Sequence, residues 1–197
     1  MLFKDFFKCL SEKPFTNLIE VDTLADIVNL HHFGVGTLTF RNFPDFQGAQ
    51  PGNFIWLESD RTSPYEEAFN DAVVFVNENI LDDLPTVRIV AAKELMHVFD
   101  GAEQRANSPE KFKELLEEIA SSPARNDTSP QYDADRVALW KAILALIPPW
   151  IREQFVDAWD KGDIKAPELA RRLVLPEEVV AAAMGRYYSV YLDRYAK

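Results

Sequence analysis

One segment near the middle of the chain constrains the fold more than any other. Apolar residues recur at helical spacing between Thr86 and Asp100, which predicts an amphipathic helix with one face in the core. Two carboxylates, Asp82 and Asp83, and Pro85 precede the segment, and these residue types are typical of a helix cap and of a first helical turn. A helix of this kind needs apolar partners, so we expect the other elements to pack around it and leave it largely buried.

The residues of this helix that carry chemistry are Lys93, Glu94 and His97. In the motif H-E-x-x-H, two histidines four residues apart share a helix face and bind zinc, and the glutamate is the general base. This sequence keeps the glutamate and the second histidine but has Lys93 where the first histidine belongs. A lysine ammonium repels a metal ion unless burial lowers its pKa far below the usual value.

The rest of the chain shows both helical and β-type patterns and no internal repeat. The run 71–77 is almost continuously apolar, which predicts a strand covered on both faces. We expect the helix 132–147 to pack across the central helix through Ala138 and Ala142, whose small side chains permit close approach. The expected helices cover 2–10, 21–32, 86–98, 109–120 and 132–147, with two or three more after 151, and the expected strands cover 35–40, 54–58 and 71–77. The chain is therefore predicted to be a single α+β domain over 1–197, with a sheet of about three strands on a mostly helical body.

The balance of charges limits the classes of partner. The formal net charge is −11, and an acidic surface disfavours direct binding to nucleic acid or to an anionic membrane. A single cysteine, Cys9, excludes an internal disulfide and fits a reducing compartment. No apolar run is long enough for a membrane span, and charges at Lys4, Asp5 and Lys8 interrupt the N-terminal segment. These features favour a soluble, cytoplasmic protein.

The order of these motifs along the chain resembles the ImmA/IrrE family, a group of small metallopeptidases linked to cleavage of phage and stress repressors. The resemblance covers roughly residues 71–184 and consists of a strand, an Asn-containing turn, an R-x-x-x-A-x-E-L-x-H helix and a later Ala-rich helix that ends in Leu-Ile-Pro. The matching residues are Val76, Asn77, Arg88, Ala91, Ala92, Glu94, Leu95, His97, Asp135, Ala138, Ala142, Leu146 and Pro148.

This resemblance implies a fold and a set of site residues. The fold would be a zincin-like minimal domain, with Glu94 in the position of the general base and His97 and Asp135 in ligand positions for zinc. The sequence departs from the family at Lys93, which replaces the first ligand, and at Asp135, which is shorter than the family's glutamate.

Three chemical roles for these residues remain open beside a purely structural role. Retained zinc would have only His97 and Asp135 as ligands, and a di-metal site would need a second E-x-x-H motif, which three histidines cannot supply. A Schiff-base role for Lys93 would need an amine with a depressed pKa. We favour a structural site in which Glu94 and Asp135 balance the Lys93 ammonium.

The favoured function is accordingly a catalytically silent metallopeptidase-like protein without a cofactor. It would act by binding another protein, such as a transcriptional regulator encoded near it on a phage or mobile element. The alternative is an active zinc metallopeptidase that cleaves a repressor.

Overall fold

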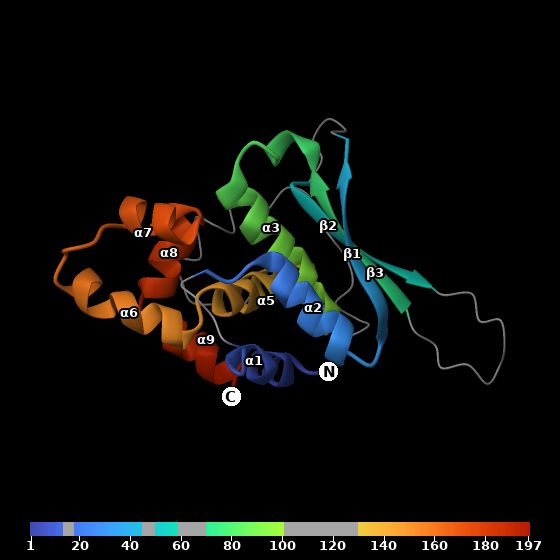
Figure 1. Cartoon of the computed structure of the whole chain (residues 1–197), viewed down its shortest axis with the longest axis horizontal. Helices are drawn as coiled ribbons and strands as arrows, with labels where there is room; N and C mark the ends of the chain where they lie inside the picture. The colour runs from blue at the N-terminus through green and yellow to red at the C-terminus, as the bar shows by residue number, and fades with distance from the viewer. Residues whose placement is uncertain (14–17, 45–49, 59–69, 101–129) are drawn as a thin grey trace.

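A three-stranded mixed sheet lies on one side of a larger helical body, so the protein is α+β, as predicted (Figure 1). The computed structural model describes residues 1–13, 18–44, 50–58, 70–100 and 130–197. The strands are β1 (Val35–Phe43), β2 (Gly52–Glu58) and β3 (Asn70–Asn77). The central strand β3 pairs parallel to β1 and antiparallel to β2. All three expected strands are present, and β1 is longer than expected.

The helix α3 (Leu84–Met96) is the element around which the described part of the chain packs. Asp83 caps it by accepting a hydrogen bond from the Thr86 amide, and Pro85 lies in its first turn, as the sequence predicts. A short 3-10 helix (His97–Phe99) continues it.

The burial of α3 goes further than an amphipathic pattern implies. Every residue from Arg88 to Met96 is buried, so this part of the helix is enclosed on all sides instead of presenting one polar face to solvent. The sheet covers one side of α3, the helix α2 (Val21–His31) lies beside it, and α5 (Pro130–Leu146) crosses the side away from the sheet (Figure 1).

The packing of α5 on α3 confirms the predicted arrangement of these two helices. Ala138 and Ala142 are fully buried, and their small side chains let the two helix axes approach closely. The expected helix 109–120 lies outside the described residues.

The C-terminal part of the chain contains four helices where two or three were expected. Pro149 starts a helix directly after α5 instead of only ending the previous one, because a proline fits the first helical turn. The N-terminal helix α1 (Phe3–Ser11) buries Phe6 and Leu10, as its apolar pattern predicts. The four helices are α6 (Pro149–Asp160), α7 (Ala166–Leu173), α8 (Glu177–Met184) and α9 (Tyr188–Tyr195), and they lie on the side of α5 away from the sheet (Figure 1).

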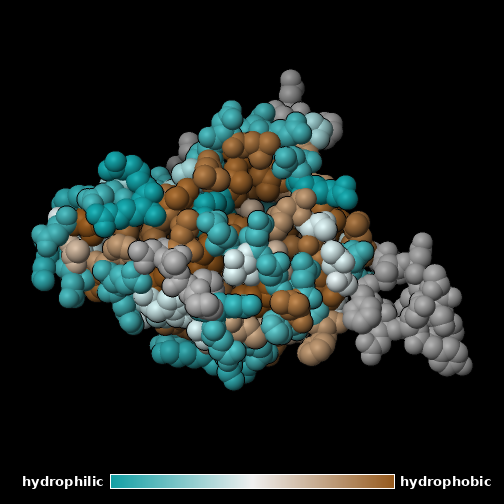
Figure 2. Space-filling view, viewed as in Figure 1, coloured by the Kyte–Doolittle hydropathy of each residue, from teal (hydrophilic) through white to brown (hydrophobic). Residues whose placement is uncertain are grey.

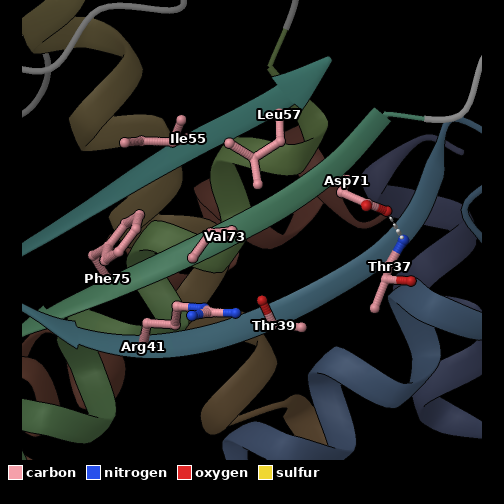
Figure 3. Close-up of a pocket in the computed structure, with 8 residues that line it drawn as sticks. All are labelled: Thr37, Thr39, Arg41, Ile55, Leu57, Asp71, Val73 and Phe75. Atoms are coloured by element: carbon pink, nitrogen blue, oxygen red, sulfur yellow. Dashed lines mark hydrogen bonds between the residues drawn. The ribbon is translucent and has the colours of Figure 1, made fainter. Parts of the chain in front are cut away.

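The two faces of the sheet differ. Ala72, Val74 and Val76 of β3 are buried on the face that α2 and α3 cover. On the other face, side chains from all three strands line a shallow depression, which includes Val73 and Asp71 and a hydrogen bond from the Thr37 amide to the Asp71 carboxylate (Figure 3). The prediction that β3 is covered on both faces is therefore correct for Val73 and wrong for Asp71, which is exposed. In the described residues, no helix is both long and apolar enough to cross a membrane.

Candidate functional site

The candidate site lies where α3 and α5 cross. Lys93, Glu94 and His97 come from α3 and the turn that follows it, and Asp135 comes from the first half of α5. All four side chains are buried, with residue exposures between 2% and 7%. The helix packing thus brings together the four residues that the sequence singled out, although Asp135 lies far from the other three in the chain.

The Lys93 ammonium occupies the middle of this site. Its Nζ lies 2.9 Å from Glu94 Oε1 and 2.6 Å from Asp135 Oδ1, so the two expected ion pairs are present. Burial by itself lowers the pKa of Lys93, but the charges of Glu94 and Asp135 outweigh burial and raise that pKa above its usual value. A Schiff-base role needs the opposite shift, so the structure argues against that chemistry.

His97 is held as a cation. Its Nδ1 donates to Asp100 Oδ2 at 2.5 Å, and its Nε2 lies 3.3 Å from Asp135 Oδ1 and 3.7 Å from Glu94 Oε2. The Nε2 contacts are not well-aligned hydrogen bonds, so they act mainly through charge. Burial lowers the pKa of His97, but the hydrogen bond to Asp100 and the carboxylates of Asp135 and Glu94 raise it to about 9. The imidazole is therefore mainly protonated at neutral pH, and a metal ion would have to displace a proton from the ring in order to bind it.

The site extends to Lys141, which the sequence analysis did not single out. Its Nζ lies 3.5 Å from the Oδ1 of Asp100, the residue that orients His97. With Lys141 protonated, three cations face three buried carboxylates, and the charges cancel. The signal in the sequence was present: Lys141 is the one charged residue in the run 137–147, and a lone charge in an apolar helix needs a buried partner. We refer to Lys93, Glu94, His97, Asp100, Asp135 and Lys141 as the charge network.

The start of β2 covers the charge network closely. A Cβ atom on Gly52 would lie 2.5 Å from Val90 Cγ1 and 2.8 Å from Glu94 Cγ, distances that real Cβ atoms do not show. Glycine at this position therefore lets the strand rest directly on α3. The ring of Phe54, two residues further along β2, lies beside the His97 imidazole with centroids 6.3 Å apart.

The donor set does not fit a catalytic zinc ion. Such an ion needs three protein ligands with free lone pairs and one open position. Here the carboxylates of Glu94 and Asp135 face the Lys93 ammonium, and His97 is protonated. Within the described ranges, no group of three or more His, Cys, Asp or Glu side chains is arranged to hold a metal ion.

The geometry therefore defines a buried, charge-balanced ion network at a helix crossing. Comparisons of the chain with family models, with curated proteins and with solved structures find no match.

Proposed function

We propose that the protein is a catalytically silent relative of the ImmA/IrrE metallopeptidases that acts by binding another protein. The observation that carries this proposal is the position of Lys93. Its ammonium lies 2.9 Å from Glu94 and 2.6 Å from Asp135, where the resemblance implies a zinc ion held by His97 and Asp135 with Glu94 as the general base. A fixed positive charge in this place neutralises the carboxylates, as a metal ion would, but it cannot activate a water molecule for hydrolysis.

The state of Glu94 supports the loss of catalysis. A general base in a zinc peptidase must be free to take a proton from metal-bound water. Glu94 is only 2% exposed, one of its oxygens is paired with Lys93, and β2 rests on its side chain at Gly52. These contacts hold the carboxylate in an ion pair and shield it from solvent within the described residues.

The proposed partner is a protein, and a transcriptional regulator encoded near it on a phage or mobile element is the candidate that the resemblance favours. The net charge of −11 supports a protein partner over direct contact with nucleic acid, because phosphate binding needs a basic face. The single cysteine supports a cytoplasmic location.

The zinc content of the purified protein tests the proposal. After expression with added zinc and removal of loosely bound metal, we expect far less than one zinc ion per chain by elemental mass spectrometry. A zinc content near one per chain, abolished by His97→Ala, would overturn the proposal and favour the active zinc metallopeptidase that cleaves a repressor.

A further inference from the structure

An apolar groove of about 330 Å³ opens beside the first half of α3. Its walls come from Val21 at the start of α2, Phe40 of β1, Val76 of β3 and Val87 of α3. None of the residues of the charge network lines it. The groove is therefore a separate feature of the same helix, at its other end.

Two leucines at the edge of the groove are unusually exposed. Leu81 is 40% exposed and Leu84 is 57% exposed, although both lie next to a groove that could have buried them. In the space-filling view, hydrophobic surface gathers over the start of α3 and is bordered by hydrophilic residues (Figure 2). Exposed apolar surface with a polar border is typical of an interaction site.

The border of this groove is acidic. Asp22 lines it on the α2 side, and Asp82 and Asp83 lie between the two leucines in the chain; all three are exposed. Among the described residues that line the groove, Arg88 is the one basic side chain. It is 6% exposed and its charge is balanced by Glu20, whose carboxylate lies 3.0 Å from the guanidinium. The remaining charge at the border is therefore negative.

The walls of the groove are held together without a partner. The Arg88 guanidinium donates to the Ile19 carbonyl at 2.9 Å as well as to Glu20, which ties the entry of α2 to α3. Asp83 caps α3 through the Thr86 amide and hydroxyl, which holds the chain beside Leu84 in place. The groove is thus preformed, and binding in it costs little ordering of its walls.

We infer that this groove is the docking site for a basic amphipathic segment of the partner protein. Apolar side chains of that segment would pack on Leu81 and Leu84, and its lysines or arginines would face Asp22, Asp82 and Asp83. Apolar anchors supply most of the affinity at such a site, and opposite charges at the border select the partner and speed its association. The inference rests on the proposed protein-binding function. It specifies where on the protein the partner binds and which kind of segment the partner uses.

A fluorescein-labelled synthetic helix of leucines and lysines, with its leucines on one face, is the probe for this site. Its affinity for the full chain is measured by fluorescence anisotropy and compared with that of two other peptides. One has the same composition with the leucines scrambled, and the other has glutamate in place of lysine. We expect the amphipathic basic peptide to bind most tightly and the acidic peptide not to bind.

Variants of the chain locate the binding. The double change Leu81→Ser, Leu84→Ser and the single change Asp82→Lys should each weaken binding by about tenfold or more, as loss of a central anchor or a border charge does. Leu30→Ser, at a 69% exposed leucine on the far end of α2, and Asp157→Lys on α6 are the matched controls and should leave the affinity unchanged. Because all these positions are exposed, every variant should keep the melting temperature of the natural protein, and this is checked first.

Three outcomes would overturn the inference. The first is binding of the basic peptide that the leucine changes leave intact, and the second is tighter binding of the acidic peptide. The third is self-association of the chain that Leu84→Ser abolishes, since a second copy would then occupy the groove. Each of these outcomes leaves the zinc content untouched, whereas stoichiometric zinc refutes the proposed function whether or not the peptide binds.

Discussion

The Lys93 ammonium lies 2.6 Å from the Asp135 carboxylate across the crossing of α3 and α5. This contact joins two helices that are distant in the chain, and it does so at a point where both side chains are buried. A buried charge persists only when it is paired, so each residue depends on the other. The consequences for stability, pH dependence and metal binding can be measured separately.

Removal of the central cation should destabilise the protein. Lys93→Met keeps a side chain of similar length but leaves Glu94 and Asp135 facing each other without a positive charge between them. We expect a loss of about 3–5 kcal/mol in the free energy of unfolding, measured by chemical denaturation, because that is the usual cost of breaking a buried pair. Lys4→Met, at an exposed position on α1, is the control and should change stability little. An unchanged free energy of unfolding in Lys93→Met would mean that the network contributes no net stability.

The charge of His97 should make stability fall at alkaline pH. The folded state raises the pKa of His97 from 6.5 to about 9, so its stabilising contribution is complete below about pH 6.5 and is lost as the pH rises through 9. A shift of this size corresponds to roughly 3 kcal/mol. Urea unfolding of the natural protein and of His97→Gln at several pH values should give a stability difference that shrinks between pH 6.5 and 9. His31→Gln, at an exposed histidine, is the control. A difference that does not vary with pH would show that His97 has the same pKa in the folded and unfolded states.

Gly52 should tolerate no side chain. Gly52→Ala would place a Cβ 2.5 Å from Val90 Cγ1 and 2.8 Å from Glu94 Cγ, so β2 or α3 would have to move. We expect a loss of about 1–3 kcal/mol, as for other overpacked positions, and a lower melting temperature. Gly34→Ala is the matched control, because the nearest atoms to its Cβ lie 3.5 Å away in a side chain. Equal stability of the two variants would contradict the close approach of β2.

Replacement of the lysine should create a metal-binding site. The double change Lys93→His, Asp135→Glu removes the cation and produces a pair of histidines four residues apart, with a carboxylate as third ligand. Asp100 already accepts a hydrogen bond from His97 Nδ1, the kind of contact that usually orients a zinc-binding histidine. We expect measurable zinc affinity in the double variant and none in the natural protein, determined by titration against a competing chelator. Equal affinities would argue that Lys93 is not the residue that excludes the metal.

Most helices and strands of the fold could be predicted from patterns of a few neighbouring residues in the sequence. Asp83 and Pro85 mark the start of α3, and β-type runs mark all three strands, because capping and side-chain periodicity act over a few residues. The four residues Lys93, Glu94, His97 and Asp135 were also accessible, since the first three follow a known helical spacing and the last follows the family resemblance.

Other parts of the site depended on contacts that no local pattern records. The sequence marks Lys141 as a lone charge in an apolar helix, but its partner, Asp100, belongs to another segment and is identified only by the tertiary structure. The ion pair of Arg88 with Glu20 was missed for the same reason. Gly52 lies outside the expected strand 54–58, and only the pairing of β2 with β3 places it against Glu94.

The sequence by itself determined the three strands, the helix around which they pack, the acidic charge and the spacing of Lys93, Glu94 and His97 on that helix. Only the tertiary structure decided that α3 is enclosed from Arg88 to Met96 and that the charges of the network are paired. The physical reason is that the cost of burying a charge depends on which opposite charges lie nearby in space. For Lys93, one of those charges is its neighbour in the chain, and the other arrives only when α5 packs across α3.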